Sequence, residues 1–122
     1  MNLQKVNLQE KFGLVNEHWQ PKIVGALNGQ HVKLAKVKGD FVWHKHDHED
    51  ELFMVIKGEL TIEFRDSKVH LMPGEFLIVP RGVEHRPIAE KEVELLLFEP
   101  ATTVNTGDQK KTEKTAEDLE WI

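Results

Sequence analysis

The sequence contains no cysteine, which excludes disulfide bonds, cysteine-ligated zinc sites and iron–sulfur clusters. It has no stripe of basic residues, so nucleic acid is not an expected partner. No apolar run is long enough to span a membrane, and the N-terminal stretch MNLQKVNLQEKF lacks the apolar core of a signal peptide. From these absences we expect a cytoplasmic protein with no membrane partner.

The length and the composition of the chain indicate one folded domain. The chain has 122 residues, of which 39% are hydrophobic and 30% charged, and its formal net charge is −5. This length is typical of a single domain, and this composition is typical of a globular one. The acidic balance gives no further information about a substrate. Since no internal repeat is present, we expect one domain over residues 1–122.

Short apolar segments separated by turn residues fill the middle of the chain. Leu60, Ile62 and Phe64 alternate with polar residues, which is the period of a β-strand. Asn28-Gly29 and Pro73-Gly74 are turn signals. The pattern predicts an all-β antiparallel sandwich or barrel with its core at about 22–100. The expected strands are 23–27, 32–37, 41–46, 52–56, 60–64, 69–71, 76–79 and 93–98.

Both ends of the chain carry weaker helical signals. Asn7 and Glu10 have the spacing of a capping box, which predicts a helical segment at 7–16. The tail at 101–122 is polar at first and is expected to wrap the surface. Thr115 and Asp118 repeat the capping spacing, which predicts one short helical turn at the C-terminus.

Three histidines and a glutamate form the chemically informative pattern. His44 and His46 are two residues apart, so in a strand both rings leave the same face. Glu51 opens the next apolar run, and His85 follows the turn residues after another strand. Imidazole and carboxylate ligands suit a divalent first-row transition metal.

Two neighbouring residues compete for places in this set. His48 is also two residues from His46, but it lies in a charged, turn-like stretch. Asp50 replaces Glu51 if the strand register slips by one residue. Glu51 is preferred because it starts the apolar strand, although the sequence leaves both alternatives open.

The spacing of these residues resembles the two motifs of the cupin family. The first motif matches Gly39, His44-Lys45-His46, Glu51 and Gly58, and the second matches Gly74, Pro80-Arg81-Gly82 and His85. Ala89 stands where the family often has asparagine. The resemblance implies a jelly-roll barrel, also called a double-stranded β-helix. It also implies that one metal is held by His44, His46, Glu51 and His85. Fe, Mn, Ni, Cu, Co and Zn are all compatible with these ligands.

Strand alternation predicts which side chains surround the metal. If Glu51 points inward, so do Phe53 and Val55, and Phe76 and Ile78 are expected to complete the pocket walls. Leu52, Met54 and Ile56, with Phe41 and Trp43, then point outward. Burying one such side chain is worth about 1.5–3 kcal/mol, so an apolar outer face should be covered. Either the N-terminal segment with Phe12 and Trp19 covers this face, or a second subunit does. We expect a homodimer, to which the strand at 23–27 contributes.

The predicted function is that of a divalent-metal-binding cupin acting on, or binding, a small organic molecule. A metal-dependent enzyme of the dioxygenase or isomerase type is one hypothesis, because a metal with open positions polarises oxygen groups or binds dioxygen. The alternative is a non-catalytic protein that binds or senses a metal or small ligand. No general base stands out beyond the four ligands, which weakens the isomerase version.

Overall fold

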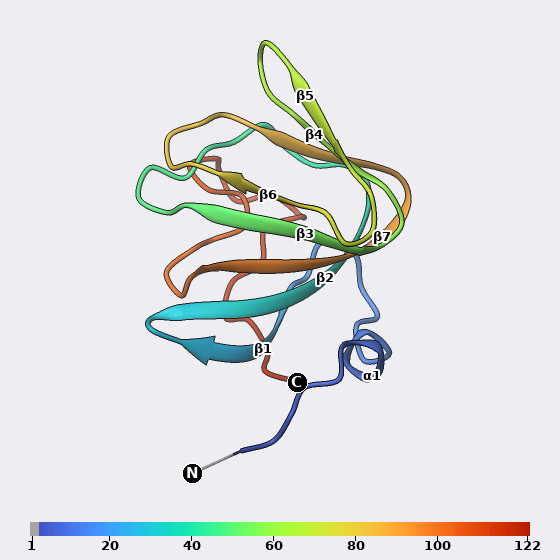
Figure 1. Cartoon of the computed structure of the whole chain (residues 1–122). Coiled ribbons are helices and arrows are strands. Elements are labelled where there is room, and N and C mark those ends of the chain that lie inside the picture. Colours follow the sequence, from blue (N-terminus) through green and yellow to red (C-terminus); the bar gives the residue numbers. More distant parts are fainter. Residues whose placement is uncertain (1–2) are drawn as a thin grey trace.

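A computed structural model describes residues 3–122 as a jelly-roll β-barrel with one short helix (Figure 1). The elements, in order, are α1 (Leu8–Phe12), β1 (Lys22–Leu27), β2 (Gln30–Asp40), β3 (Glu51–Lys57), β4 (Leu60–Glu63), β5 (Lys68–Leu71), β6 (Phe76–Val79) and β7 (Arg86–Pro100). No helix within 3–122 is long and apolar enough to cross a membrane.

Strand β7 connects the two parts of the barrel. Its C-terminal half lies between β2 and β3 in a sheet with the order β1-β2-β7-β3-β6. Its N-terminal residues pair with β4, which pairs in turn with β5. All of these pairings are antiparallel. The all-β fold predicted from the alternation is confirmed, and the predicted strand at 93–98 is only part of the longer β7, within its C-terminal half.

The inner face of the main sheet follows the alternation along three strands. Buried side chains on β2, β3 and β7 point into the barrel, and at one end of each strand a charged residue takes the place of an apolar one. These inner residues are Lys33, Ala35, Val37, Glu51, Phe53, Val55, Val93, Leu95, Leu97 and Glu99. The charged end of this face is where the candidate site lies.

The prediction that Phe76 and Ile78 line the pocket is wrong. Phe76 is 57% exposed and Ile78 is 52% exposed. The register of β6 against β3 places them opposite Met54 and Leu52, on the outer face of the sheet. Leu77 and Val79 point inward instead. In a short strand that is apolar at every position, alternation does not show which side faces the core.

The segment that carries the histidine pair is not a regular strand. Beyond β2, the only bridge in residues 41–46 is formed by His44, so the strand predicted there does not form. Strand alternation therefore does not apply to Phe41, which was expected on the outside. Phe41 is buried and stacks on Trp19, with ring centroids 4.6 Å apart.

The two chain ends differ in how well they match the prediction. Asn7 caps α1 by accepting a hydrogen bond from the Glu10 amide at 3.0 Å, but the helix ends at Phe12. The C-terminal helical turn does not form. Instead, residue 121 lies beside β1, where Ile23 donates to the carbonyl of Glu120 and accepts from the amide of Ile122.

The turn after β3 offers a test of backbone packing. Gly58 has φ +92°, and a Cβ there would lie 2.9 Å from the carbonyl oxygen of Glu92. Gly74 has a similar φ of +85° but no atom within 4 Å of its Cβ position. We expect Gly58→Ala to lower the free energy of unfolding by about 3 kcal/mol, and Gly74→Ala by only about 1 kcal/mol, in urea unfolding. Equal losses would show that the backbone contact contributes nothing.

Candidate metal centre

The structure brings together the side chains of His44, His46, Glu51 and His85. One ligand atom from each lies within 4.8 Å of all the others. The Glu51 Oε1 atom is 2.9 Å from His46 Nε2 and 3.2 Å from His85 Nε2. All four residues are buried. The set predicted from three separated places in the sequence therefore converges in one enclosed space.

Backbone hydrogen bonds hold this arrangement together. The amide of His44 donates to the carbonyl of His85 at 3.1 Å, and the amide of His85 donates back at 2.9 Å. Gly82 donates to the carbonyl of His46 at 2.8 Å. The irregular segment between β2 and β3 is therefore tied to the residues that precede β7. Glu51 is placed by β3 itself, as its first residue.

Contacts with backbone carbonyls orient two of the imidazoles. His44 Nδ1 lies 2.8 Å from the carbonyl of Val42, and His85 Nδ1 lies 2.9 Å from the carbonyl of Val83. A carbonyl only accepts, so each ring donates from Nδ1, and the neutral tautomer with that proton has its lone pair on Nε2. Metal-binding histidines are commonly held in this way through the nitrogen that does not bind the ion.

The electrostatics favour the protonation states that a cation requires. Burial, together with the nearby His85, lowers the pKa of His44 to about 4, so its ring is neutral near neutral pH. Burial by itself raises the pKa of Glu51. The contacts with His46 and His85 outweigh this effect and hold that pKa well below its usual range. Neutral imidazoles and an ionised carboxylate are the ligand forms.

The donor atoms fit a transition metal. His46 Nε2, His85 Nε2 and Glu51 Oε1 are buried and have no hydrogen bond that satisfies them, despite their closeness to one another. Buried polar atoms without partners are rare, because each costs about 1–3 kcal/mol. A divalent cation between them would satisfy all three. Three nitrogens and one oxygen leave further coordination positions open.

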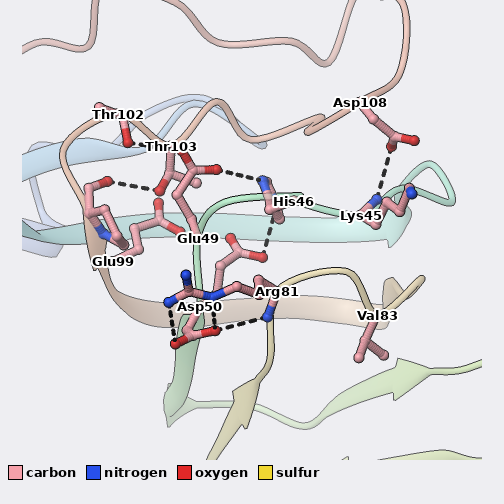
Figure 2. A network of polar contacts seen from close by, with 12 residues as sticks. Lys45, His46, Glu49, Asp50, Arg81, Val83, Glu99, Thr102, Thr103 and Asp108 are labelled. Carbon is pink, nitrogen blue, oxygen red and sulfur yellow. Dashed lines mark hydrogen bonds and ion pairs between the residues drawn. The ribbon is translucent and has the colours of Figure 1, made fainter.

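The two competing residues lie outside this group. His48 is exposed. Asp50 is also exposed, and it accepts hydrogen bonds from the backbone amide and the guanidinium of Arg81 (Figure 2). Arg81 holds the pKa of Asp50 below its usual range. The register therefore points Glu51, and not its neighbour, toward the histidines.

The sequence reasoning missed a second buried carboxyl at this end of the barrel. Glu99 is 2% exposed and accepts a hydrogen bond from the ammonium group of Lys33, itself 1% exposed, at 2.9 Å. Burial, followed by the charge of the neighbouring Glu51, raises the pKa of Glu99 well above its ordinary value, and Lys33 opposes that rise. Glu99 continues the inward positions of Leu95 and Leu97, which is the signal that could have found it.

A partly open cavity of about 40 Å³ adjoins the site. His44, Glu51 and Glu99 provide its polar wall. Apolar side chains, Phe53 among them, form most of the rest. Val55, which was also expected in the pocket wall, does not line this cavity and lies in the core cluster. The other lining residues are Trp19, Pro21, Ala35, Val37, Phe41, Pro87, Leu95, Leu97 and Asn105. Since a buried water needs about 10–15 Å³ by the same measure, the cavity has room for a few waters.

Comparisons with known proteins agree with this geometry. The Cupin_2 family, described as "Cupin domain", matches residues 30–99. The uncharacterized protein YdbB of Bacillus subtilis (strain 168) is 38% identical over 64 residues, which are 52% of this chain and 57% of that protein. The match therefore covers little more than half of that relative.

Two solved structures are similar over most of the chain. A cupin-2 domain containing protein from Shewanella frigidimarina NCIMB 400 is 44% identical, with a TM-score of 0.77 over 78% of this chain and 93% of that one. Protein NMB1881 from Neisseria meningitidis is 31% identical, with a TM-score of 0.74 over 80% of this chain and 100% of that one.

Proposed function

The chain belongs to the cupin family, and we propose that it binds one divalent transition metal through His44, His46, Glu51 and His85. The observation that carries this proposal is the set of buried donor atoms that lack hydrogen bonds and face one another. Fe, Mn, Ni, Cu, Co and Zn all accept this mixture of nitrogen and oxygen ligands.

The bound metal would act as a Lewis acid toward an oxygen atom of a small ligand. The chain's own residues prepare the site for that role. The carbonyls of Val42 and Val83 fix two rings, and the apolar walls formed by Phe41 and Phe53 keep bulk water away. Excluding water strengthens electrostatic interactions inside the cavity.

Elemental analysis of protein purified without added metal tests the proposal. We expect about one transition metal per chain and, after removal by a chelator, re-uptake of one equivalent of Co(II) or Zn(II). Protein that contains no metal and takes up none would contradict it. A His46→Ala variant that retains the full equivalent would contradict the ligand assignment.

We further propose that the ligand is a small organic molecule, processed by a metal-dependent enzyme of the oxygenase or isomerase type. A non-catalytic role in binding or sensing is the alternative, because the same four residues serve both. A turnover screen against small phenolics, diketones and sugar phosphates, with Fe, Mn, Ni and Zn forms, separates them. Product formation that needs the metal supports an enzyme, whereas binding without turnover supports the alternative.

We also propose a homodimer that covers the outer face of β3 and β6. Exposed Phe76 and Ile78 lie in register with half-buried Met54 and Leu52. Helix α1 covers the adjacent part of this outer face, where Phe12 packs in one apolar cluster with Leu34 and Ile56. In a two-fold symmetric dimer, the same surface patch of each subunit forms the interface. A second copy of this chain is therefore the simplest partner for this apolar face.

Light scattering after gel filtration measures the dimer directly. We expect twice the chain mass at micromolar concentration and the mass of one chain for the double variant Phe76→Ser/Ile78→Ser, since each buried apolar side chain contributes about 1.5–3 kcal/mol. Lys68→Ser, at the exposed first position of β5, serves as the control and should remain dimeric. A monomeric wild-type protein would contradict the proposal.

A further inference from the structure

The C-terminal segment lies outside the region that matches the cupin domain, which ends at residue 99. We call residues 101–122 the C-terminal strap. In Figure 1 it is the orange-to-red trace that leaves the end of β7, crosses the barrel and returns to β1. Thr103, Thr106 and Ala116 are buried within it, so it packs as part of the folded structure.

The strap is attached directly to the segment that carries the histidine pair. Lys45, which separates His44 from His46, donates its amide to the Asp108 carboxylate at 2.9 Å, and the Asp108 amide donates to the carbonyl of Lys45 at 3.0 Å (Figure 2). The hydroxyl of Thr102 donates to Glu49 at 2.8 Å. These bonds attach the strap on both sides of His46.

Gly107 lies directly against the histidine segment. A Cβ at this position would lie 2.3 Å from the carbonyl oxygen of Lys45 and 3.1 Å from Cδ2 of His44. Its φ of +57° is also a conformation that favours glycine. Only glycine allows the strap to lie this close to the histidine segment.

Asn105 is the strap residue that lines the cavity of about 40 Å³ beside the candidate site. Its side-chain amide donates to the carbonyl of Lys114 at 2.7 Å, and its side-chain oxygen accepts from the amide of Ala116 at 2.8 Å. These bonds fix Asn105 within the strap, and its side-chain amide also lies 3.4 Å from the carbonyl of Trp19, another residue that lines the cavity.

With the strap in place, the four candidate ligands are almost inaccessible. Their exposed fractions are 2% for His44, 4% for His46, 4% for Glu51 and 1% for His85. The cavity of about 40 Å³ holds a few waters at most. A second cavity, of about 190 Å³, lies between residues 45–49 and strap residues 102–108 and reaches His46. The strap therefore borders both this outer cavity and the smaller cavity beside the site.

We propose that the C-terminal strap determines the size of the external ligand that reaches the metal. Seated, it admits water and small linear anions, and a larger organic ligand binds only when the strap lifts from the histidine segment. This inference rests on the proposed metal site. Gly107 and Asp108 hold the strap against the histidine segment, and the strap in turn controls which ligands enter.

Two variants loosen the strap at different points. Gly107→Ala places a methyl group against a backbone carbonyl that cannot move aside, and Asp108→Ala removes the carboxylate that binds the Lys45 amide. Gly74→Ala is the matched control for the glycine change, because Gly74 also has a positive φ but nothing near its Cβ position. If Gly107→Ala does not fold, Asp108→Ala alone carries the test.

Each protein is loaded with Co(II), whose visible spectrum reports a change of ligand, and is titrated with azide and then with 4-nitrocatechol. We expect azide to bind wild type and variants with affinities within about threefold of one another. We expect 4-nitrocatechol to bind at least about tenfold more tightly to both strap variants than to the wild-type or Gly74→Ala protein. Equal binding of 4-nitrocatechol to all of them would overturn the inference.

The cobalt content, measured before each titration, distinguishes a failure of the metal site from a failure of the role proposed for the strap. Wild-type protein that takes up no cobalt would overturn the metal site, and the role of the strap with it. A full equivalent of cobalt with the same ligand preferences in every variant would leave the metal site standing and overturn only the role of the strap.

Discussion

Replacing His85 with alanine is expected to lower the affinity for Co(II) or Zn(II) by more than about 100-fold, because partners that only support a ligand already account for about 10–100-fold. His85 supplies one of the four converging donor atoms. The reciprocal hydrogen bonds between His85 and His44 are formed by main-chain atoms, so the variant retains them. Competition with a chromophoric chelator gives the affinity, and circular dichroism checks the fold.

Two control variants test the residues that compete for places in the ligand set. His48→Ala removes an exposed imidazole close in sequence to His46. Asp50→Asn removes a negative charge next to Glu51 but keeps an acceptor for Arg81. Both variants should keep the wild-type affinity within about threefold. If either loses as much affinity as His85→Ala, the ligand set is wrong. If His85→Ala binds like wild type, the site itself is wrong.

Removing the ammonium group of Lys33 is expected to have the largest effect on stability. Lys33→Met leaves Glu99 buried without its partner at 2.9 Å. Breaking a buried ion pair from one side costs about 3–5 kcal/mol, because the remaining group stays buried without the partner that compensated its burial. Urea unfolding of the metal-free protein measures the loss, and removing the metal first keeps its binding energy out of the comparison.

The double variant Lys33→Met/Glu99→Leu distinguishes the effect of the ion pair from the effect of side-chain packing around it. Replacing both members of a buried ion pair with apolar residues is often neutral or stabilising. We therefore expect the double variant to recover most of the stability that Lys33→Met loses, to within about 1 kcal/mol of wild type. If the two changes instead destabilise additively, the ion pair is not the reason for the loss. Packing of the long side chains would then be the cause.

The sequence predicted many elements because their signals are local. Strand β6 has the bounds that were expected, and Asn28 and Gly29, with φ of 50° and 76°, form the predicted hairpin turn. The ligand candidates were also found locally, because His44, His46 and Glu51 lie within one short stretch. Such patterns depend on residues a few positions apart, which any single sequence displays.

Other features depended on contacts between distant strands. Phe76 and Ile78 were placed on the wrong side because the register of β6 against β3 decides the facing. Phe41 was expected outside, but the chain leaves the strand after Asp40 and turns this ring onto Trp19. Alternation in a sequence defines two faces without saying which one meets the core.

The sequence by itself determined the residue types, the spacing of the candidate ligands and the all-β character, because these follow from chemistry and from short-range periodicity. Only the tertiary structure decided that His85 meets His44, that Lys33 pairs with Glu99 across β2 and β7, and that the strap closes over the histidine segment. Each of these joins residues far apart in the chain. Their distances are set by strand register and by the path of the loops, which no local pattern encodes.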